Sequence, residues 1–130
     1  MVNADTFLDE QAYCIASAAP APVIVSTPVA DRSRYGALSS NDDGQAAGID
    51  EKGSTGPGWI NAGVLGFDGA DLARFGVRRC SLEGDILPNH LKRGALRTVR
   101  YEGSIIDIGT RESLSKIRQT GVRELYDSKQ

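Results

Sequence analysis

Two aspartates that stand far apart in the sequence each close a short apolar run, and these runs constrain the fold most strongly. Asp5 closes the run at residues 1–4, and Asp107 closes the run at residues 104–106. Short apolar runs bounded by turn signals are typical of buried strands. In an open α/β sheet, chemistry collects outside the carboxyl ends of the strands. The pair therefore predicts an α/β fold in which two carboxylates converge on one hard cation.

Magnesium is the cation that such a pair suits, because proteins typically hold it through one or two carboxylates plus substrate phosphates. A simpler alternative exists for each residue, since an aspartate after a strand is often the N-cap of the following helix. Thr110 is a better cap candidate than Asp107 for the last helix. The spacing alone leaves both interpretations of Asp5 and Asp107 open, and the first one favours phosphate chemistry.

Composition excludes several classes of protein. A chain of 130 residues suits one modest domain, and its net charge of −2 argues against a nucleic-acid surface, which is normally basic. No apolar stretch is long enough to cross a bilayer, and a secretory signal pattern is absent. Cys14 and Cys80 are too few for a disulfide framework or a zinc site, so we expect reduced thiols in the cytoplasm.

Local patterns predict a mixed order of helices and strands. We expect helices at residues 6–19, 71–75, 82–93 and 111–121, the third capped by Ser81 and interrupted at Pro88, the fourth capped by Thr110. Leu114 and Ile117 of the last helix are expected to face the core. Extended segments are expected at residues 1–4, 22–26, 33–38, 44–49, 59–67, 96–101 and 103–108, with Asn-Asp-Asp-Gly at 41–44 as a hairpin turn and residues 53–58 as a loop.

Several polar residues are candidates for binding. Glu51 and Lys52 precede a glycine-rich loop, where a lysine can reach a phosphate, although a solvated surface pair is the commoner role. Asn61 lies inside an apolar run and must find a partner, either neighbouring backbone or a ligand. Gly63 in the same run indicates close approach of a backbone or a ligand. For His90, packing is a better explanation than catalysis, because no acid or nucleophile is spaced to match it.

An ordered set of short segments resembles the sugar-1-phosphate nucleotidyltransferases over almost the whole chain. The segments are Val-Asn-Ala-Asp-Thr at 2–6, Ser-Arg-Tyr-Gly at 33–36, Glu-Lys-Gly at 51–53, Trp-Ile-Asn-Ala-Gly-Val at 59–64, Ser-Leu-Glu-Gly-Asp-Ile-Leu-Pro at 81–88 and Ile-Asp-Ile-Gly-Thr at 106–110. They look most similar to the guanylyltransferases of D-glycero-D-manno-heptose 1-phosphate and mannose 1-phosphate.

The resemblance implies an activity and a set of site residues. A sugar 1-phosphate attacks the α-phosphorus of a nucleoside triphosphate, and pyrophosphate leaves. By resemblance, Asp5 and Asp107 bind Mg²⁺, and Lys52 joins them as a catalytic residue. Glu51 and Lys52 contact the sugar and its phosphate, and Asn61 and Gly63 contact the sugar. Lys52 is followed by Gly53, where the family usually has proline.

The family's glycine-rich opening segment, which cradles the triphosphate and reads the base, has no counterpart here. The resemblance therefore implies a partial Rossmann-like nucleotidyltransferase sheet with an inserted hairpin and without the N-terminal strands. Residues 1–121 would be the C-terminal, acceptor and metal half, and 122–130 a tail. An exposed sheet edge would then favour poor stability alone, self-association or a partner chain. Three functions follow: a nucleotidyltransferase fragment, a sugar-phosphate-binding module without catalysis, or a partner that pairs through its sheet edge.

Overall fold

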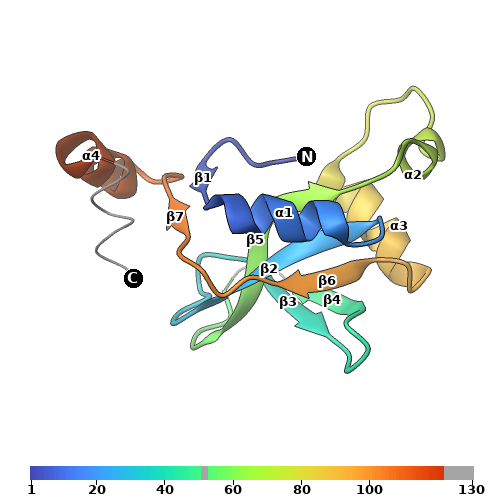
Figure 1. The fold of residues 1–130 in the computed structure, drawn as a ribbon, viewed down its shortest axis with the longest axis horizontal. Coiled ribbons are helices and arrows are strands. Elements are labelled where there is room, and N and C mark those ends of the chain that lie inside the picture. The colour runs from blue at the N-terminus through green and yellow to red at the C-terminus, as the bar shows by residue number, and fades with distance from the viewer. Residues whose placement is uncertain (51–52, 122–130) are drawn as a thin grey trace.

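The computed structural model of this chain describes residues 1–50 and 53–121, and they form a mixed α/β fold (Figure 1). In chain order the elements are β1 (Thr6–Phe7), α1 (Glu10–Ala18), β2 (Val23–Val29), β3 (Ala37–Ser40), β4 (Ala46–Asp50), β5 (Gly58–Gly66), α2 (Gly69–Ala73), the π-helical turn η1 (Leu82–Ile86), α3 (Leu87–Lys92), β6 (Arg97–Arg100), β7 (Ile106–Asp107) and α4 (Arg111–Thr120). Within this described part, no helix is long and apolar enough to cross a membrane.

A mixed five-stranded sheet in the order β4-β3-β5-β2-β6 forms the centre of the molecule. β2 pairs with β6 in parallel and with β5 antiparallel, and the β3–β4 hairpin extends the sheet beyond β5. A separate two-stranded sheet joins β1 to β7 antiparallel. The partial α/β sheet with an inserted hairpin is therefore confirmed. Residues 33–38 were expected to be extended, but the first strand of the hairpin begins only at Ala37, and the residues before it form a turn.

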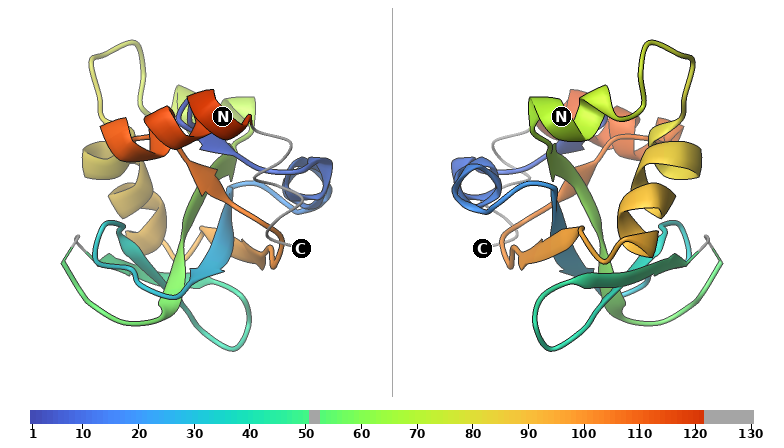
Figure 2. Two further views of the ribbon diagram at one scale, coloured as in Figure 1. Left: turned by 90° about the vertical axis from the view of Figure 1, so that its left-hand side faces the viewer. Right: turned by 90° about the vertical axis from the view of Figure 1, so that its right-hand side faces the viewer.

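Both faces of the central sheet are covered by helices, as Figure 2 shows for α1 on one side and α3 on the other. Val25 of β2 packs with Ala12 and Ala16 of α1 in one apolar cluster. The next residue back, Ile24, packs with Leu87 and Leu96 in a second cluster. Successive strand residues point to opposite faces, so a strand covered on both faces needs a continuous apolar run. This is why residues 22–26 could be recognised as a strand.

The sequence predicted the N-caps of two helices correctly, but it placed the start of the first helix too early. Ser81 caps η1, and Pro88 stands in the first turn of α3, where a new helix begins. Thr110 caps α4 through a capping box with Ser113. The first helix starts later than expected, at Glu10, because the side chain of Asp9 accepts from Ala12 N and ends the extended segment there.

Two expectations were wrong. Residues 1–4 are not a buried strand: Val2 forms an isolated bridge to Val64, and Met1 and Val2 are 58% and 50% exposed. The last helix does not pack its apolar side in the core, because α4 has no buried residue. Leu114 and Ile117 are half-buried, and Ile117 lines a surface cavity described below. Among the described residues, α4 therefore has no large buried apolar interface.

One edge of the central sheet, that of β6, is less open than the sequence suggested. Gln45 at the hairpin tip bridges to Arg97 of β6, and the backbone N–H of Thr98 donates to Gly44 O at 2.7 Å. The hairpin tip therefore covers part of the outer edge of β6. The exposed apolar side chains of Met1 and Val2 lie instead on the N-terminal segment beside β5. Association through an exposed sheet edge stays a prediction.

His90, the one histidine in the sequence, is fully buried in α3, which confirms a packing role. The rings of Phe67 and Phe75 lie 5.7 and 5.9 Å from it, and neither imidazole nitrogen has a hydrogen-bond partner among the described residues. Burial lowers the pKa of His90 below its ordinary value of 6.5, although the nearby Asp71 carboxylate acts in the opposite direction. The folded chain therefore holds His90 neutral at a pH where the unfolded chain has begun to protonate it.

We expect the free energy of unfolding to fall as the pH drops below 6.5, because the unfolded state then binds more protons than the folded state. The slope attributable to His90 is at most about 1.4 kcal/mol per pH unit. Urea denaturation between pH 5 and 8 would measure it. His90→Leu should remove this slope, and a slope that is the same in both proteins would contradict the assignment.

Candidate functional site

Asp5 and Asp107 lie close together in the structure, but beside a separate two-stranded sheet and not at the strand ends of the central sheet. The antiparallel pairing of β1 with β7 sets Thr6 opposite Asp107. The backbone N–H of Ile108 donates to Asp5 O at 2.8 Å and closes the same contact. A Cβ atom on Gly109 would lie 3.0 Å from Asp107 Oδ1 and 3.3 Å from Asp5 Oδ2. The two carboxylates therefore border one small space beside Gly109.

Neither aspartate caps a helix, so the simpler interpretation of the sequence does not hold. Asp9 is the N-cap of α1 and Thr110 is the N-cap of α4. Asp5 lies in a turn before β1 and is exposed, and its Oδ1 accepts a long hydrogen bond from the Thr6 hydroxyl at 3.4 Å. The carboxylates are thus left for another role at the junction of β1, β7 and the loop before α4.

Asp107 is fixed by three donors from two parts of the chain. Its Oδ1 accepts from Gly109 N at 2.7 Å. Its Oδ2 accepts from the Tyr35 hydroxyl at 2.9 Å and from Arg34 Nη2 at 3.1 Å. Burial raises the pKa of Tyr35, and the hydrogen bond to Asp107 raises it further, so the phenol stays a proton donor at neutral pH. The carboxylate therefore has one defined orientation.

The donor set suits a hard divalent cation. Magnesium prefers oxygen ligands and completes its shell with water and substrate phosphates, so two carboxylates are sufficient protein ligands. Zinc sites use three or four nitrogen, sulfur or oxygen ligands, and within residues 1–50 and 53–121 no group of three or more His, Cys, Asp or Glu side chains could hold a metal ion. Asp5 Oδ2 and Asp107 Oδ1 would hold Mg²⁺ in the space that a side chain at position 109 would fill.

A surface cavity of about 330 Å³ adjoins Asp107. Its walls come from the end of β2, the loop with Arg34 and Tyr35, β7, and α4, which contributes residues 113, 116 and 117. The charged groups that line it are Asp31, Arg34, Asp107 and Lys116, and Ile106 and Ile117 supply part of its apolar wall. The cavity thus combines two carboxylates, two cationic side chains and apolar surface, and Lys116 is the lining cation that could meet an anionic group of a ligand.

Asn61 and Gly63 lie on β5 and are tied to the segment that carries Asp5. Asn61 Oδ1 accepts from Gly63 N at 2.9 Å, so neighbouring backbone is one partner of this amide. Gly63 has a φ of +81°. The backbone N–H of Asn3, in the N-terminal segment, donates to Gly63 O at 2.8 Å. A Cβ on Gly63 would lie 3.0 Å from the Asn3 side chain. Close approach at Gly63 is confirmed, and sugar contact by either residue stays a prediction.

Glu51 and Lys52 lie outside the described residues, so their predicted roles stay predictions. The loop that follows them is anchored near the site. Asp31 Oδ1 accepts from Gly56 N at 3.2 Å, and the Ser33 hydroxyl donates to Asp31 Oδ2 at 2.8 Å. These hydrogen bonds, that of the Ser33 hydroxyl above all, lower the pKa of Asp31. An ionised Asp31 therefore joins the loop at residues 53–57 to the wall of the cavity.

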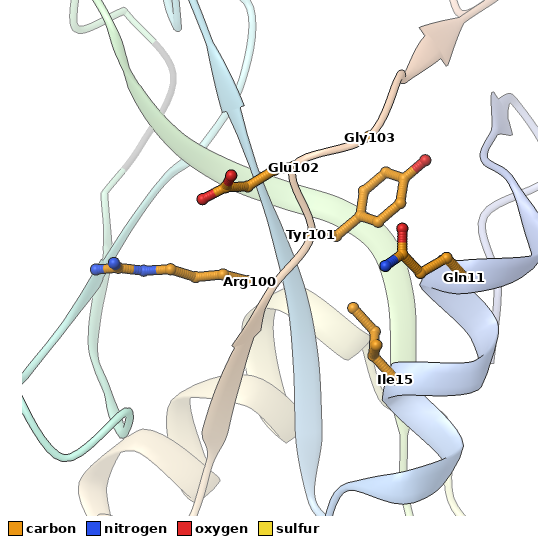
Figure 3. A pocket seen from close by; sticks show the side chains of 6 residues that line it. All are labelled: Gln11, Ile15, Arg100, Tyr101, Glu102 and Gly103. Carbon is orange, nitrogen blue, oxygen red and sulfur yellow. The ribbon is translucent and has the colours of Figure 1, made fainter.

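A second cavity of about 440 Å³ lies between α1 and the strand end at Arg100, apart from the aspartate pair (Figure 3). Gln11 and Ile15 line it from the helix, and Tyr101 lies between them and Arg100. Arg100 points away from the helix, and its guanidinium lies 4.9 Å from the centre of the Trp59 ring. This arginine is therefore engaged in a cation–π contact, and the cavity shows no cluster of groups that would do chemistry.

Arg34 and Tyr35 are the site residues that the sequence reasoning missed. They belong to the Ser-Arg-Tyr-Gly segment that carries part of the family resemblance, but that segment suggested no role for them. Their contact with Asp107 joins residues more than 70 positions apart. The local sequence pattern cannot predict a contact between residues so far apart. An arginine next to a tyrosine was the one feature of the sequence that could have pointed to these two residues.

Comparison with solved structures gives the context of this geometry. The chain is similar to HddC from Yersinia pseudotuberculosis, a D-glycero-D-manno-heptose 1-phosphate guanylyltransferase, with 30% identity and a TM-score of 0.74 over 88% of this chain and 51% of that one. HddC complexed with GMP-PN matches with a TM-score of 0.73, 30% identity and the same coverage. A protein from Bacillus anthracis assigned as a glucose-1-phosphate thymidylyltransferase, in complex with sucrose, shares the fold at 20% identity, with a TM-score of 0.66 over 90% of this chain and 51% of that one.

The chain thus spans about half the length of each of these structures. No protein-family profile matches its sequence, and a search of curated proteins finds no match. The likeness to the sugar-1-phosphate nucleotidyltransferases therefore rests on the solved structures. It confirms the resemblance that the short sequence segments carried.

Proposed function

We propose that this chain, which has the fold of about half of a sugar-1-phosphate nucleotidyltransferase, provides the acceptor-binding and Mg²⁺-binding part of a transferase in nucleotide-sugar biosynthesis. One observation carries the proposal: Asp5 and Asp107, from two distant segments, border the same small space beside Gly109. Arg34 pairs with Asp107 through Oδ2, so Oδ1 and the Asp5 carboxylate face this space without a cationic side chain of their own, which favours a bound cation there.

In the proposed reaction, a phosphate oxygen of the sugar 1-phosphate bonds to the α-phosphorus of a nucleoside triphosphate. The bond from that phosphorus to the bridging oxygen breaks, and pyrophosphate leaves with the electron pair. Guanosine triphosphate is the proposed donor, since two of the similar structures are of a guanylyltransferase. The segment that would bind the base is not among the segments of this chain, so the complete site needs further chain.

Each site residue has a proposed task. Asp5 and Asp107 would hold Mg²⁺, which when bound neutralises charge on the phosphates. Lys52 would bind the acceptor phosphate as a point charge, and Glu51 a sugar hydroxyl. Asn61 and Gly63 would contact the sugar. Such transfer depends on positioning two anions, and the cavity beside Asp107 with Arg34 and Lys116 favours an anionic acceptor there.

A second function, a non-catalytic sugar-phosphate-binding or sheet-pairing module, is favoured by two observations. The chain spans about half of the enzymes it resembles, and Met1 and Val2 expose apolar side chains on the N-terminal segment. Such a module would bind the acceptor or a partner chain and would leave nucleotide binding to that partner. For either function we propose the cytoplasm as the location, in keeping with the free, exposed thiols of Cys14 and Cys80.

Pyrophosphate release tests the enzymatic proposal. The chain would be assayed with Mg²⁺, each nucleoside triphosphate and heptose or mannose 1-phosphate, alone and together with the separately expressed N-terminal half of HddC. We expect turnover in the mixture with guanosine triphosphate. Asp5→Asn and Asp107→Asn should each reduce turnover by more than ~100-fold. Loss of a residue that only hydrogen-bonds to a metal ligand already lowers metal affinity or activity ~10–100-fold.

Asp43→Asn is the matched control, because it removes one carboxylate from the exposed hairpin turn and should leave turnover unchanged. Absence of turnover in every mixture, with acceptor binding retained, would support the non-catalytic function. Turnover that survives both site substitutions would contradict the assignment of Asp5 and Asp107.

A further inference from the structure

We infer that Arg34 and Tyr35 are positioning residues for Asp107 with opposite effects on a divalent cation: Tyr35 favours its binding and Arg34 opposes it. The inference rests on the cation site of the proposed function and extends it to two residues for which the sequence suggested no role. Both residues contact the same carboxylate oxygen, Oδ2.

The two oxygens of Asp107 face different surroundings. Oδ2 points to the loop, where it accepts from the Tyr35 hydroxyl at 2.9 Å and from Arg34 Nη2 at 3.1 Å. Oδ1 points to the space beside Gly109 that Asp5 Oδ2 also borders. Oδ1 also accepts from Gly109 N at 2.7 Å, and the donors on Oδ2 act with this bond to set the rotation of the carboxylate and present Oδ1 to Asp5. Hydrogen bonds of this kind orient metal ligands, and their loss typically weakens metal binding ~10–100-fold.

Tyr35 meets the requirements of a fixed, neutral donor. It is half-buried, and its backbone N–H donates to Arg32 O at 2.9 Å, which holds the loop in a tight turn. A phenol adds no charge, so it orients the carboxylate without competing for it. Removal of its hydroxyl should leave Oδ2 held by the charged Arg34 alone, so that Asp107 is less well oriented and binds a cation more weakly.

Arg34 differs from Tyr35 because it carries a full positive charge. Its ion pair neutralises Asp107 in the chain without a cation, and a cation at Oδ1 would be repelled by the guanidinium. The Arg34 side chain is 53% exposed and lines the open cavity beside Asp107, so it has room to move away when a cation binds. Loss of this charge should therefore tighten cation binding.

Titration of Mn²⁺, a paramagnetic substitute for Mg²⁺, tests the inference through the electron paramagnetic resonance signal of the free ion. Tyr35→Phe should weaken Mn²⁺ binding by ~10-fold or more. Arg34→Gln should tighten it roughly three- to tenfold, and Arg34→Lys, which keeps the charge, should return it toward the wild-type affinity. Arg78→Gln is the matched control, since it removes one positive charge from the loop after α2, at the opposite end of the molecule from α4 (Figure 1). It should bind Mn²⁺ as the wild type does.

A purely structural role for the two residues would change stability without changing affinity in opposite directions. The inference would be overturned if Tyr35→Phe and Arg34→Gln both bound Mn²⁺ with wild-type affinity while Asp107→Asn abolished binding. That result would leave the cation site itself standing. A wild-type chain that binds no Mn²⁺ would overturn both. Arg34 is exposed, so its Gln and Lys variants decide the question even if Tyr35→Phe does not fold.

Discussion

Gly109→Ala should strongly weaken divalent-cation binding while the chain stays folded. The new Cβ would lie 3.0 Å from Asp107 Oδ1 and 3.3 Å from Asp5 Oδ2, in the space between the carboxylates. A magnesium ion must approach each oxygen to about 2.0–2.1 Å, so a methyl group there excludes it. Gly109 is exposed and has no positive φ, so alanine fits the backbone. We expect Mn²⁺ affinity to fall by at least ~10-fold, measured by titration with circular dichroism as the check on folding.

Gly84→Ala is the matched control for this prediction. A Cβ at Gly84 would make an ordinary contact of 3.5 Å with Ser81, far from the aspartates in sequence and in a different element. It should bind Mn²⁺ like the wild type. Unchanged binding by Gly109→Ala would show that the cation does not occupy the space beside Gly109, and the proposed site would then be wrong.

Gly103→Ala should cause a large loss of stability. A Cβ at this position would overlap the ring and hydroxyl of Tyr101, whose side chain is 2% exposed and packs in the cluster between α1 and the sheet. The phenol cannot retreat easily, because its hydroxyl donates to Ser104 O at 3.2 Å. Overpacking of this kind typically costs about 1–3 kcal/mol. Urea denaturation would measure the change in the free energy of unfolding.

Gly69→Ala tests whether the effect comes from the overlap or from loss of a glycine as such. A Cβ at Gly69 would meet no atom within 4 Å at the start of α2. Its stability should lie within about 0.5 kcal/mol of the wild type. Equal denaturation midpoints for Gly103→Ala and Gly69→Ala would mean that Tyr101 is not packed against Gly103.

Features that depend on neighbouring residues could be predicted from the sequence. The Asn-Asp-Asp-Gly turn at 41–44 gave the β3–β4 hairpin, since Gly44 adopts a φ of +75° that the turn requires. Thr110 was recognised as a cap because a capping box is local to one helical turn. The apolar run at 59–67 was recognised as a strand because β5 is buried on both faces.

Features that depend on distant pairing could not be predicted from the sequence. Asp5 and Asp107 were expected to meet at the ends of buried strands in one open sheet, but they lie beside the short strands β1 and β7, which form a separate antiparallel pair. Strands this short leave no recognisable period. The contacts of Arg34 and Tyr35 with Asp107 depend on how the loop after β2 folds toward β7. Leu114 and Ile117, three positions apart, predicted a core-facing side for the last helix, but α4 has no buried residue.

Calorimetric titration of heptose 1-phosphate into the chain, with and without Mg²⁺, tests the central claim most directly, because it needs no nucleotide-binding segment. We predict binding that requires Mg²⁺ and that Asp5→Asn and Asp107→Asn each abolish. Binding of equal strength without Mg²⁺, or in both variants, would contradict a cation site formed by these carboxylates. A chain that binds no sugar phosphate under any condition would contradict the acceptor-binding role itself.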